Sequence, residues 1–348
     1  MTLDSGDAVD AMILASKWDS VEGTLSAETS WQNAMKRALR DGHALCDLLG
    51  ISTKHAIAKD DTDFSVFVPL EYVARMKPGT PDDPLLRQVL ASPQEFDTSV
   101  GFLDPVGDLA AQRADGLLQK YDHRALLVTT GACAVHCRYC FRRHYPYETV
   151  PKSQAGLQNS LELIAADPSL EEIILSGGDP LTLPDERLSW LVSELDRIPH
   201  VRRIRVHTRL PVVIPQRINP QMLNWVANTN SAVYFVLHFN HANEIDDRVT
   251  TGLTALRRAG ATLMNQAVLL RGINDSPEEQ RELCVQLINR QVLPYYLHQL
   301  DPVAGAMHFS VADDCGRAII EFLRGRLPGY AVPRLVREIP GQPSKTPL

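Results

Sequence analysis

The chain has 348 residues, of which 44% are hydrophobic and 22% are charged, close to the average composition of a soluble globular protein. Global disorder and a single small module are excluded, and at about 100 to 200 residues per domain the length allows two domains or one barrel with additions. The apolar content allows a large core, so the chain should fold alone or with copies of itself, as a homo-oligomer. The 35 basic and 42 acidic residues give a net charge of −7 without long runs of one sign, so no nucleic acid partner is expected.

The first residues are not expected to act as a targeting signal. Residues 1–25 lack a basic start, and their single apolar run, residues 11–15, is too short for the core of a signal peptide or for a membrane span. The sequence therefore predicts a cytoplasmic protein without a membrane partner.

An N-terminal helical region is predicted over residues 1–105. Apolar side chains recur near the helical period from Trp31 to Leu49, and Gly50 is a favourable residue for the end of a helix. Prolines interrupt the following stretch, in which residues 85–90 are predicted as a short helix.

From Arg124 onward, short β-branched runs alternate with helical patterns, as in parallel βα units whose strands are buried on both faces. The six predicted strands are residues 125–130, 172–176, 203–208, 232–238, 262–268 and 293–300. The six predicted helices are residues 154–166, 184–197, 220–228, 250–260, 277–291 and 313–327.

This alternation predicts an α/β fold with a partial (β/α)6 TIM-like barrel over residues 106–328, followed by a C-terminal strand and loop over residues 329–348. A doubly wound sheet stays open as an alternative, because strand order cannot be read from one sequence. In either fold the chemistry is expected where the strands end. Polar or glycine-rich groups do lie at or just after the ends of four of the predicted strands. These groups are the cysteine cluster at 133–140, the turn at 176–179, His238 and Asp301.

The six cysteines form a clustered set and a scattered set. The clustered set, in a CxxxCxxC pattern, is Cys133, Cys137 and Cys140. The scattered set, predicted to be buried apolar thiols, is Cys46, Cys284 and Cys315. Three thiolates on one tight loop can hold three irons of a 4Fe-4S cluster, and the fourth iron can then chelate the amino and carboxylate groups of a small molecule.

Two alternatives for the clustered thiols stay open at this point. Structural zinc would need a fourth Cys or His at finger-like spacing; His136 and His144 are near, but no second CxxC follows. Chance proximity of three thiols is the other alternative.

The cysteine pattern, with Tyr139 before the last cysteine and a barrel strand before the first, resembles the radical S-adenosylmethionine (SAM) superfamily. The turn formed by Ser176, Gly177, Gly178 and Asp179 is similar to the glycine-rich turn of that superfamily, whose backbone binds the methionyl amino group of SAM. Glycines allow such a backbone to approach a ligand without interference from a Cβ atom. Without the cysteines, the same turn would equally fit an ordinary connection from a strand to a helix.

Further segments resemble the lysine 2,3-aminomutases, and the resemblance extends from about residue 78 to the end. These segments are HTRLPVV at 207–213, HFNH at 238–241, NQAVLLRG at 265–272 and LPYY at 293–296. Within that family the chain most resembles the short enzymes that make β-lysine for the modification of translation elongation factor P, notably in residues 329–330, 337–339 and 343–348. The longer metabolic enzymes carry a cysteine-rich zinc tail, which this sequence does not show.

The resemblance implies an isomerase with a 4Fe-4S cluster, SAM and pyridoxal 5′-phosphate (PLP), and an electron donor such as flavodoxin or ferredoxin. It assigns PLP to Lys345, in a loop rich in glycine and proline that could lead this lysine into the barrel mouth. It implies that Arg142 binds the carboxylate of the substrate lysine through the planar, two-pronged guanidinium group. The ammonium group of the substrate side chain is assigned to Asp301 and Glu338, where Glu338 replaces the aspartate of the longer enzymes.

The same resemblance places Arg124 and Lys120 around the phosphate end of PLP, although basic residues before a strand are commonly surface caps. It also implies that aromatic and amide side chains line the cofactor pocket, where they could equally serve packing. These are Tyr139, His238, Gln266 and Asn240.

The implied reaction converts L-lysine to β-lysine by a 5′-deoxyadenosyl radical, with SAM regenerated at the end. An aminomutase for glutamate is an alternative, but such an enzyme would need a cation or an amide at the positions of Asp301 and Glu338 to bind the side-chain carboxylate. A non-catalytic iron-sulfur electron carrier would normally have four cysteine ligands and no PLP lysine. The third alternative is a zinc-stabilised interaction module.

Overall fold

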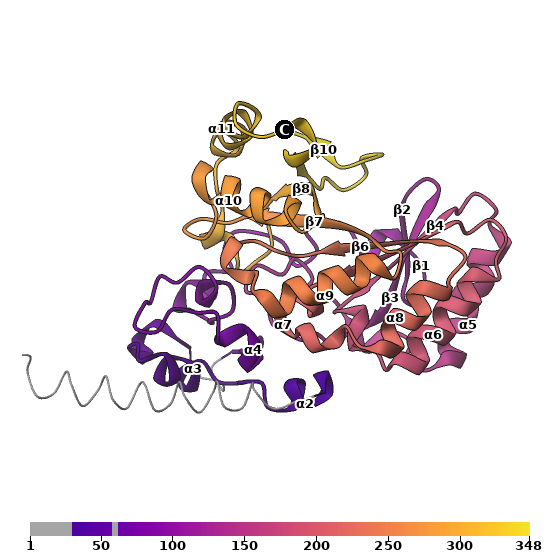
Figure 1. The fold of residues 1–348 in the computed structure, drawn as a ribbon, viewed down its shortest axis with the longest axis horizontal. Coiled ribbons are helices and arrows are strands. Elements are labelled where there is room, and N and C mark those ends of the chain that lie inside the picture. Colours follow the sequence, from indigo (N-terminus) through magenta and orange to yellow (C-terminus); the bar gives the residue numbers. More distant parts are fainter. Residues whose placement is uncertain (1–29, 58–61) are drawn as a thin grey trace, which may run out of the picture.

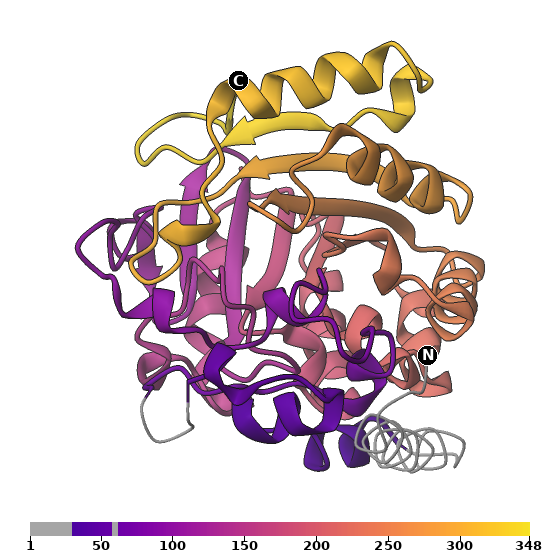
Figure 2. The same ribbon diagram turned by 90° about the vertical axis from the view of Figure 1, so that its left-hand side faces the viewer.

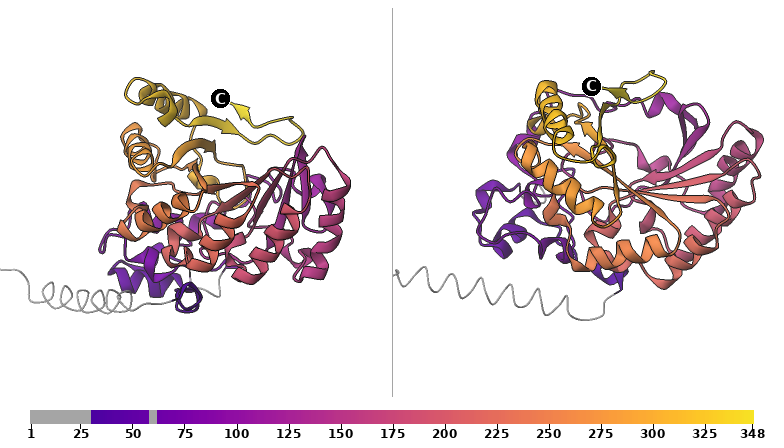
Figure 3. Two further views of the ribbon diagram at one scale, coloured as in Figure 1. Left: turned by 45° about the vertical axis from the view of Figure 1, so that its right-hand side comes forward. Right: turned by 45° about the horizontal axis from the view of Figure 1, so that its top comes forward.

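A computed structural model describes residues 30–57 and 62–348. Its centre is one open sheet whose strands curve around the inside of the molecule, with helices on the outside (Figures 1 and 3). The parallel strands are β3 (Arg124–Thr130), β4 (Glu172–Gly177), β5 (Arg203–Thr208), β6 (Ala232–Leu237), β7 (Thr262–Leu269), β8 (Leu293–Gln299) and β9 (Arg334–Arg337). The antiparallel strands at the two edges are β1 (Gln112–Ala114), β2 (Leu117–Tyr121) and β10 (Thr346–Pro347).

The strands follow one another across the sheet in chain order, from β1 to β10. A doubly wound sheet reverses its strand order at a switch point, so that alternative is wrong and the partial barrel is confirmed. All six predicted strands are present within one residue of their predicted bounds, and β9 adds a seventh parallel strand.

Helices connect the successive parallel strands and cover the outside of the barrel. They are α5 (Gln154–Ala166), α6 (Asp185–Asp196), α7 (Leu210–Val213), α8 (Pro220–Asn228), α9 (Asp247–Arg258), α10 (Pro277–Ile288) and α11 (Asp313–Arg324). The six predicted helices are confirmed, but three boundaries were wrong. Helix α9 begins three residues early because the Asp246 carboxylate caps it by accepting from Val249 N at 2.8 Å. Helices α10 and α11 each end three residues early, at Ile288 and Arg324. The amides of the next residues, Asn289 and Gly325, bond to carbonyls of the last turn.

The inner face of the barrel is more polar than predicted. In β5 the buried Ile204 and Val206 join the apolar core, whereas the half-buried Arg205 and His207 alternate with them. The prediction of strands buried on both faces is therefore wrong for β5, whose second face carries these polar groups. Strand β7 also alternates buried and half-buried residues, but its half-buried residues are Met264, Gln266 and Val268, of which one is polar.

The N-terminal region lies across one end of the barrel (Figure 2). It contains α2 (Trp31–Lys36), α3 (Gly42–Leu49) and α4 (Leu70–Val73). Helix α3 ends at Gly50, which adopts φ 65° as the sequence predicted. The continuous helical period from Trp31 is broken because Leu39 leaves the helix and exchanges two backbone hydrogen bonds with Val68, at 2.8 and 2.9 Å.

Two other expectations concern this region. The segment predicted as a short helix at 85–90 forms only a 3-10 turn, Leu86–Gln88. The apolar run at 11–15 and the rest of residues 1–29 lie outside the described residues. Across the described ranges, no helix has the length and apolar character needed to cross a membrane.

Candidate active site

The three clustered cysteines lie on the loop that follows β3, and each is half-buried. Burial raises the pKa of Cys133 well above its usual range, and the neighbouring Cys140 and Cys137 raise it further. Burial and the nearby Cys137 likewise raise the pKa of Cys140 to about 11. The three thiols therefore lie close enough to repel one another as thiolates, an arrangement that a bound metal centre would stabilise.

This donor set fits an iron-sulfur cluster better than a single zinc ion. Within residues 30–57 and 62–348, no three His, Cys, Asp or Glu side chains converge as the ligands of one metal ion. The ligands of a 4Fe-4S cluster need not converge, because each thiolate binds a different iron. The two histidines considered for zinc bond elsewhere: His136 Nδ1 pairs with Ser65 O at 2.7 Å, and His144 Nε2 with Ala304 O at 3.2 Å.

The scattered cysteines lie apart from the loop. Cys46 and Cys284 are buried apolar thiols, as predicted, and burial raises the pKa of Cys284 to about 12. The prediction is wrong for Cys315, which is half-buried at the start of α11 and places its Sγ 3.8 Å from Asp275 O.

The N-terminal region holds the cysteine loop in place. Arg138, between two of the cysteines, is fully buried and donates from both Nε and Nη2 to the Glu95 carboxylate, at 2.8 and 2.5 Å. Its backbone N–H donates to Gln88 O at 2.9 Å, and His136 N donates to Phe67 O at 2.9 Å. Sequence reasoning missed Glu95, because no local pattern connects a lone acid with an arginine 43 residues later.

The glycine-rich turn after β4 packs directly on the cysteine loop. Gly178 N donates to Thr130 O at 2.8 Å, and Asp179 N donates to Ala132 O at 2.7 Å. A Cβ atom on Gly178 would lie 2.3 Å from Ala132 O, and one on Gly177, where φ is +123°, would lie 2.5 Å from Thr130 O. The two glycines are therefore required for the close contact of this turn with the backbone of residues 130–132. The sequence had predicted only that they approach a ligand. The turn and the cysteines are adjacent, as a SAM site that spans both would require.

Gly178→Ala should displace the cysteine loop, because the new methyl group would meet a backbone carbonyl that cannot rotate away. We expect the free energy of unfolding to fall by about 1–3 kcal/mol and anaerobically reconstituted protein to lose most of its iron. Gly329→Ala is the matched control, since a Cβ atom there meets nothing within 4 Å. Equal iron contents in the two variants would contradict this role of Gly178.

The Asp179 side chain connects two strand ends. Its carboxylate accepts from Thr208 Oγ1 at 2.7 and 2.9 Å, from Arg209 N at 2.7 Å and from Leu210 N at 2.9 Å. It also caps the next turn by accepting from Leu181 N at 3.0 Å. These protein groups occupy both carboxylate oxygens, and the backbone N–H of Asp179 bonds to Ala132 O, so Asp179 holds the turn against the cysteine loop and the end of β5.

A chain of ion pairs runs across the barrel mouth and contains four of the predicted site residues. Arg142 Nε lies 2.6 Å from Asp108 Oδ2, and Lys120 Nζ lies 2.7 Å from Asp108 Oδ1. Lys120 Nζ is also 3.6 Å from Glu338 Oε1, and Lys345 Nζ is 2.5 Å from Glu338 Oε2. Burial raises the pKa of Asp108, but Arg142 and Lys120 outweigh it and lower this pKa to about 2. Asp108 is therefore the charged centre that holds both cations.

Sequence reasoning missed Asp108 and the partners of Glu338. Glu338 Oε1 accepts from the Tyr121 hydroxyl at 2.6 Å, so its carboxylate bonds to protein groups through both oxygens. Lys120 is not a surface cap: it lies on β2 and donates to Val106 O at 2.8 Å as well as pairing with Asp108. The β1–β2 hairpin that carries Lys120 and Tyr121 was not predicted either.

The C-terminal loop brings Lys345 into the barrel mouth. Strand β10 pairs with β9, with Thr346 opposite Arg337, and this pairing folds the loop back over the strand ends. Burial lowers the pKa of His207 and of His298 well below the usual range, and the nearby charge of Lys345 lowers both further. Both imidazoles, on β5 and β8, are therefore neutral at pH 7 and lie near Lys345.

Two polar atoms near Lys345 are buried without a hydrogen-bond partner among the described residues: Asp301 Oδ1 and His207 Nε2. Burial raises the pKa of Asp301 to about 7, although the charge of Lys345 opposes this shift. Unpaired polar atoms are rare in protein interiors. Their position beside a lysine at the strand ends fits a polar ligand that supplies the missing partners, including a PLP group held by Lys345.

The remaining predicted pocket residues occupy different surroundings. Tyr139 stacks on His238, with ring centroids 5.6 Å apart, and its hydroxyl lies 3.0 Å from His238 Nε2. Burial, aided by the charge of Arg209, lowers the pKa of His238 to about 3. Asn240 is fully buried, and its Oδ1 accepts a hydrogen bond from Val268 N at 2.9 Å, so its side chain supports the structure of the barrel.

Gln266 and Arg124 lie farther along their strands. Gln266 is half-buried on β7, opposite Tyr296 of β8. Arg124 begins β3 and places its guanidinium 4.5 Å from the centre of the Tyr121 ring, on the same hairpin as Lys120.

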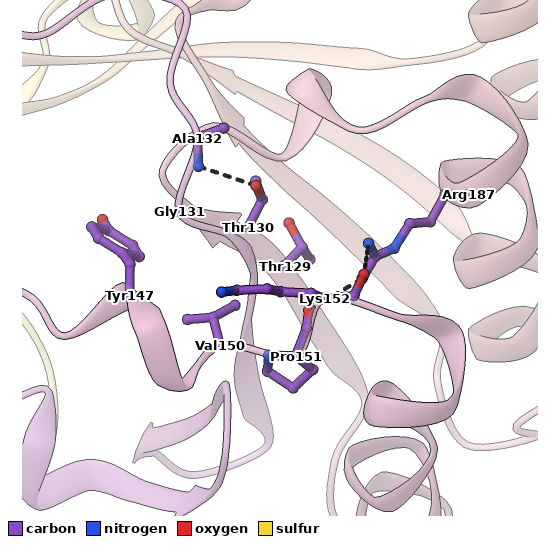
Figure 4. A pocket seen from close by; sticks show the side chains of 9 residues that line it. All are labelled: Thr129, Thr130, Gly131, Ala132, Tyr147, Val150, Pro151, Lys152 and Arg187. Atoms are coloured by element: carbon purple, nitrogen blue, oxygen red, sulfur yellow. Dashed lines mark hydrogen bonds between the residues drawn. The ribbon is translucent and has the colours of Figure 1, made fainter.

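Two cavities adjoin this region. One of about 540 Å³ opens at the ends of β8 and β9 and is lined in part by Leu300, Pro302 and Glu338. The other, of about 310 Å³, lies beside the start of the cysteine loop, where Gly131 and Ala132 face side chains of the segment before α5 and of α6 (Figure 4). The first adjoins the ion-pair chain, so it offers access to the barrel mouth.

Comparison with protein families matches residues 127–284 to the Radical SAM superfamily. This range includes the cysteine loop, the glycine-rich turn and strands β4 to β7.

Among curated relatives, a protein of Escherichia coli (strain K12) named L-lysine 2,3-aminomutase is 45% identical over 91% of this chain and 94% of its own length. A protein of the same name from Haemophilus influenzae is 41% identical over 93% of this chain and 97% of its own. A more distant relative from Clostridioides difficile, named glutamate 2,3-aminomutase, is 33% identical over 92% of this chain and 77% of its own.

Proposed function

Since the chain belongs to the lysine 2,3-aminomutase family of radical SAM enzymes, we propose that it moves the α-amino group of free L-lysine to the β-carbon and so forms β-lysine. The relatives include an enzyme named for glutamate, so the substrate must be argued from the site. The side chains of the two substrates end in opposite charges, and the charge of the pocket is therefore the deciding feature.

The observation that carries the choice of lysine is the acid pair at the barrel mouth. Asp301 is buried with Oδ1 unpaired, and Glu338 lies close enough to raise the pKa of Asp301. A substrate ammonium group would satisfy Asp301 and offset the repulsion between the two acids. A glutamate side chain would add a third carboxylate to the same place, which is unfavourable.

When bound, the 4Fe-4S cluster and SAM supply a 5′-deoxyadenosyl radical for hydrogen abstraction, and PLP supplies an electron-accepting ring for the migrating amino group. Cys133, Cys137 and Cys140 are the residues proposed to hold the cluster, and Lys345 the residue proposed to hold PLP. Ser176, Gly177 and Gly178 would contribute to SAM binding from the turn that packs on the cysteine loop.

The protein itself orients the substrate between two charged ends. Arg142 is buried and held from two sides, by Asp108 and by an Nη1 hydrogen bond to Ser176 Oγ at 3.1 Å. Held in this way, its guanidinium is fixed in position to bind a carboxylate. Asp301 and Glu338 would take the ammonium group at the other end, and the surrounding N-terminal region and C-terminal loop would exclude water.

Asp301→Asn is expected to lower kcat/KM for lysine by at least about 10²-fold, because losing one member of a buried charge pair costs about 3–5 kcal/mol. The pH profile gives a second measurement. Burial raises the pKa of Asp301 to about 7, so protonation below that pH should weaken lysine binding, and kcat/KM should fall as the pH decreases. Asp301→Asn should remove this dependence.

Glu338→Asp is the control for that experiment, since it keeps the charge and shortens the side chain by one methylene. We expect activity within about tenfold of wild type. Normal turnover of lysine by Asp301→Asn, or a wild-type preference for glutamate, would contradict lysine as the substrate and leave the radical chemistry in place.

We further propose that the β-lysine serves the modification of translation elongation factor P in the cytoplasm, and that flavodoxin or ferredoxin reduces the enzyme. Support comes from the similarity of residues 329–330, 337–339 and 343–348 to the enzymes with that role. Mass spectrometry of elongation factor P from cells without this gene should show loss of the β-lysine modification. The modification should return when β-lysine is added to the growth medium. An unchanged modification would contradict this role and leave the aminomutase reaction intact.

A further inference from the structure

The segment HTRLP, residues 207–211 at the end of β5, contains an arginine that the proposed reaction does not use. Arg209 is buried, with 6% of its surface exposed. Its Nη1 donates to Cys137 Sγ at 2.7 Å and to the Tyr139 hydroxyl oxygen at 2.6 Å. A buried cation thus contacts one of the three clustered sulfurs.

The rest of the Arg209 side chain is held rigidly. Its Nη2 donates to Glu244 Oε1 at 2.6 Å, to Gln88 Oε1 at 2.7 Å and to the Tyr72 hydroxyl oxygen at 3.0 Å. The backbone N–H of Arg209 donates to the Asp179 carboxylate at 2.7 Å. The guanidinium therefore points one nitrogen at the sulfur and the other at a fully buried carboxylate.

We propose that Arg209 raises the reduction potential of the cluster bound through Cys137. In this step one electron from an external reductant enters the cluster, and no bond forms or breaks. Hydrogen bonds to the sulfurs and the net charge around a cluster set its potential. The N–H donor withdraws electron density from the sulfur, and the cation stabilises the added electron with little screening in a buried site.

Glu244 limits this effect without cancelling it. Its carboxylate bonds to Nη2, whereas Nη1 contacts the sulfur, so the positive end of the ion pair faces the cluster. Electrostatic energy falls with distance, and the nearer charge therefore dominates. Removing Glu244 should leave more positive charge beside the cluster and raise the potential.

The experiment measures the midpoint potential of anaerobically reconstituted full-length protein by a redox titration followed by electron paramagnetic resonance. Arg209→Met should decrease the equilibrium constant for reduction of the cluster at least tenfold. This decrease corresponds to a midpoint potential lower by about 59 mV or more for a one-electron couple. Arg209→Lys, which keeps the charge but loses the fork, should lower it less. Glu244→Gln should shift it in the positive direction.

Arg217→Met is the matched control. Arg217 is also buried and lies eight residues after Arg209, but it bonds to Leu181 O and pairs with Asp185 instead of contacting a cysteine. The midpoint potential of the cluster in the Arg217→Met variant should equal that of wild type. An unchanged potential in Arg209→Met with full iron content, or an equal shift in Arg217→Met, would overturn the proposal.

The inference rests on the proposed cluster at the three cysteines, and the two can fail separately. Iron content and the visible spectrum report the cluster, whereas the midpoint potential reports Arg209. If Arg209→Met does not retain iron, Glu244→Gln decides: a positive shift supports the proposal, and an unchanged or more negative potential overturns it.

Discussion

Alanine at Cys133, Cys137 or Cys140 is expected to abolish the broad visible absorption of the cluster and to leave almost no iron on the protein after anaerobic reconstitution. A 4Fe-4S cluster with three protein ligands has no spare thiolate, and the three sulfurs share one loop. Aminomutase activity should fall to the background of the assay, because no radical can form. Iron analysis and visible spectroscopy provide the measurement.

The control replaces Cys46, Cys284 and Cys315 together by alanine or serine. These cysteines lie apart from the loop, so iron content should equal that of wild type. Stability is expected to decrease, because Cys46 and Cys284 are buried. Loss of iron from this triple variant would refute the assignment of the ligands.

Lys345→Ala is expected to abolish the covalent attachment of PLP. Borohydride treatment should fix pyridoxyl to wild-type protein and leave the variant unlabelled, as judged by mass spectrometry of the C-terminal peptide. The cluster spectrum should stay unchanged, because Lys345 contacts Glu338 at the ends of β8 and β9 and not the cysteine loop. Activity with lysine should be lost with the attachment.

The exposed Lys36 at the end of α2 provides the matched control, since Lys36→Ala removes a lysine far from the barrel mouth in sequence. The Lys36→Ala variant should retain the borohydride-fixed pyridoxyl group to the same extent as wild type. Retention of the label in Lys345→Ala would show that another lysine holds PLP, and Lys120, 3.6 Å from Glu338, would then be the next residue to test.

The βα order of this protein could be predicted from its sequence because strands and helices are specified by local periodicity. Apolar runs and helical patterns placed the six strands within one residue. The cysteine loop and the glycine-rich turn could be found for a related reason, since CxxxCxxC and SGGD are contiguous and their chemistry needs close spacing along the chain. The use of the two glycines was visible only in the structure, where each meets a backbone carbonyl.

Strand order and the inner face of the barrel were decided by tertiary structure. The same βα alternation is compatible with two sheet topologies, and only the observed pairing of each strand with its neighbours in the chain distinguishes them. Burial of both strand faces was expected from apolar content, but in β5 the half-buried Arg205 and His207 alternate with the core residues Ile204 and Val206. Apolar content alone does not show which face of a strand packs against the helices.

The electrostatics of the site also depended on tertiary structure. Asp108 joins Arg142 to Lys120, Glu95 holds Arg138, and Glu244 holds Arg209, across 34, 43 and 35 residues of sequence. A sequence shows that a charge exists but not which opposite charge the fold brings within 3 Å of it. Local patterns thus determined which segments are proposed to carry the chemistry of this protein. The long-range pairing of charges in a buried site, which no periodicity encodes, determined how the residues of these segments are held.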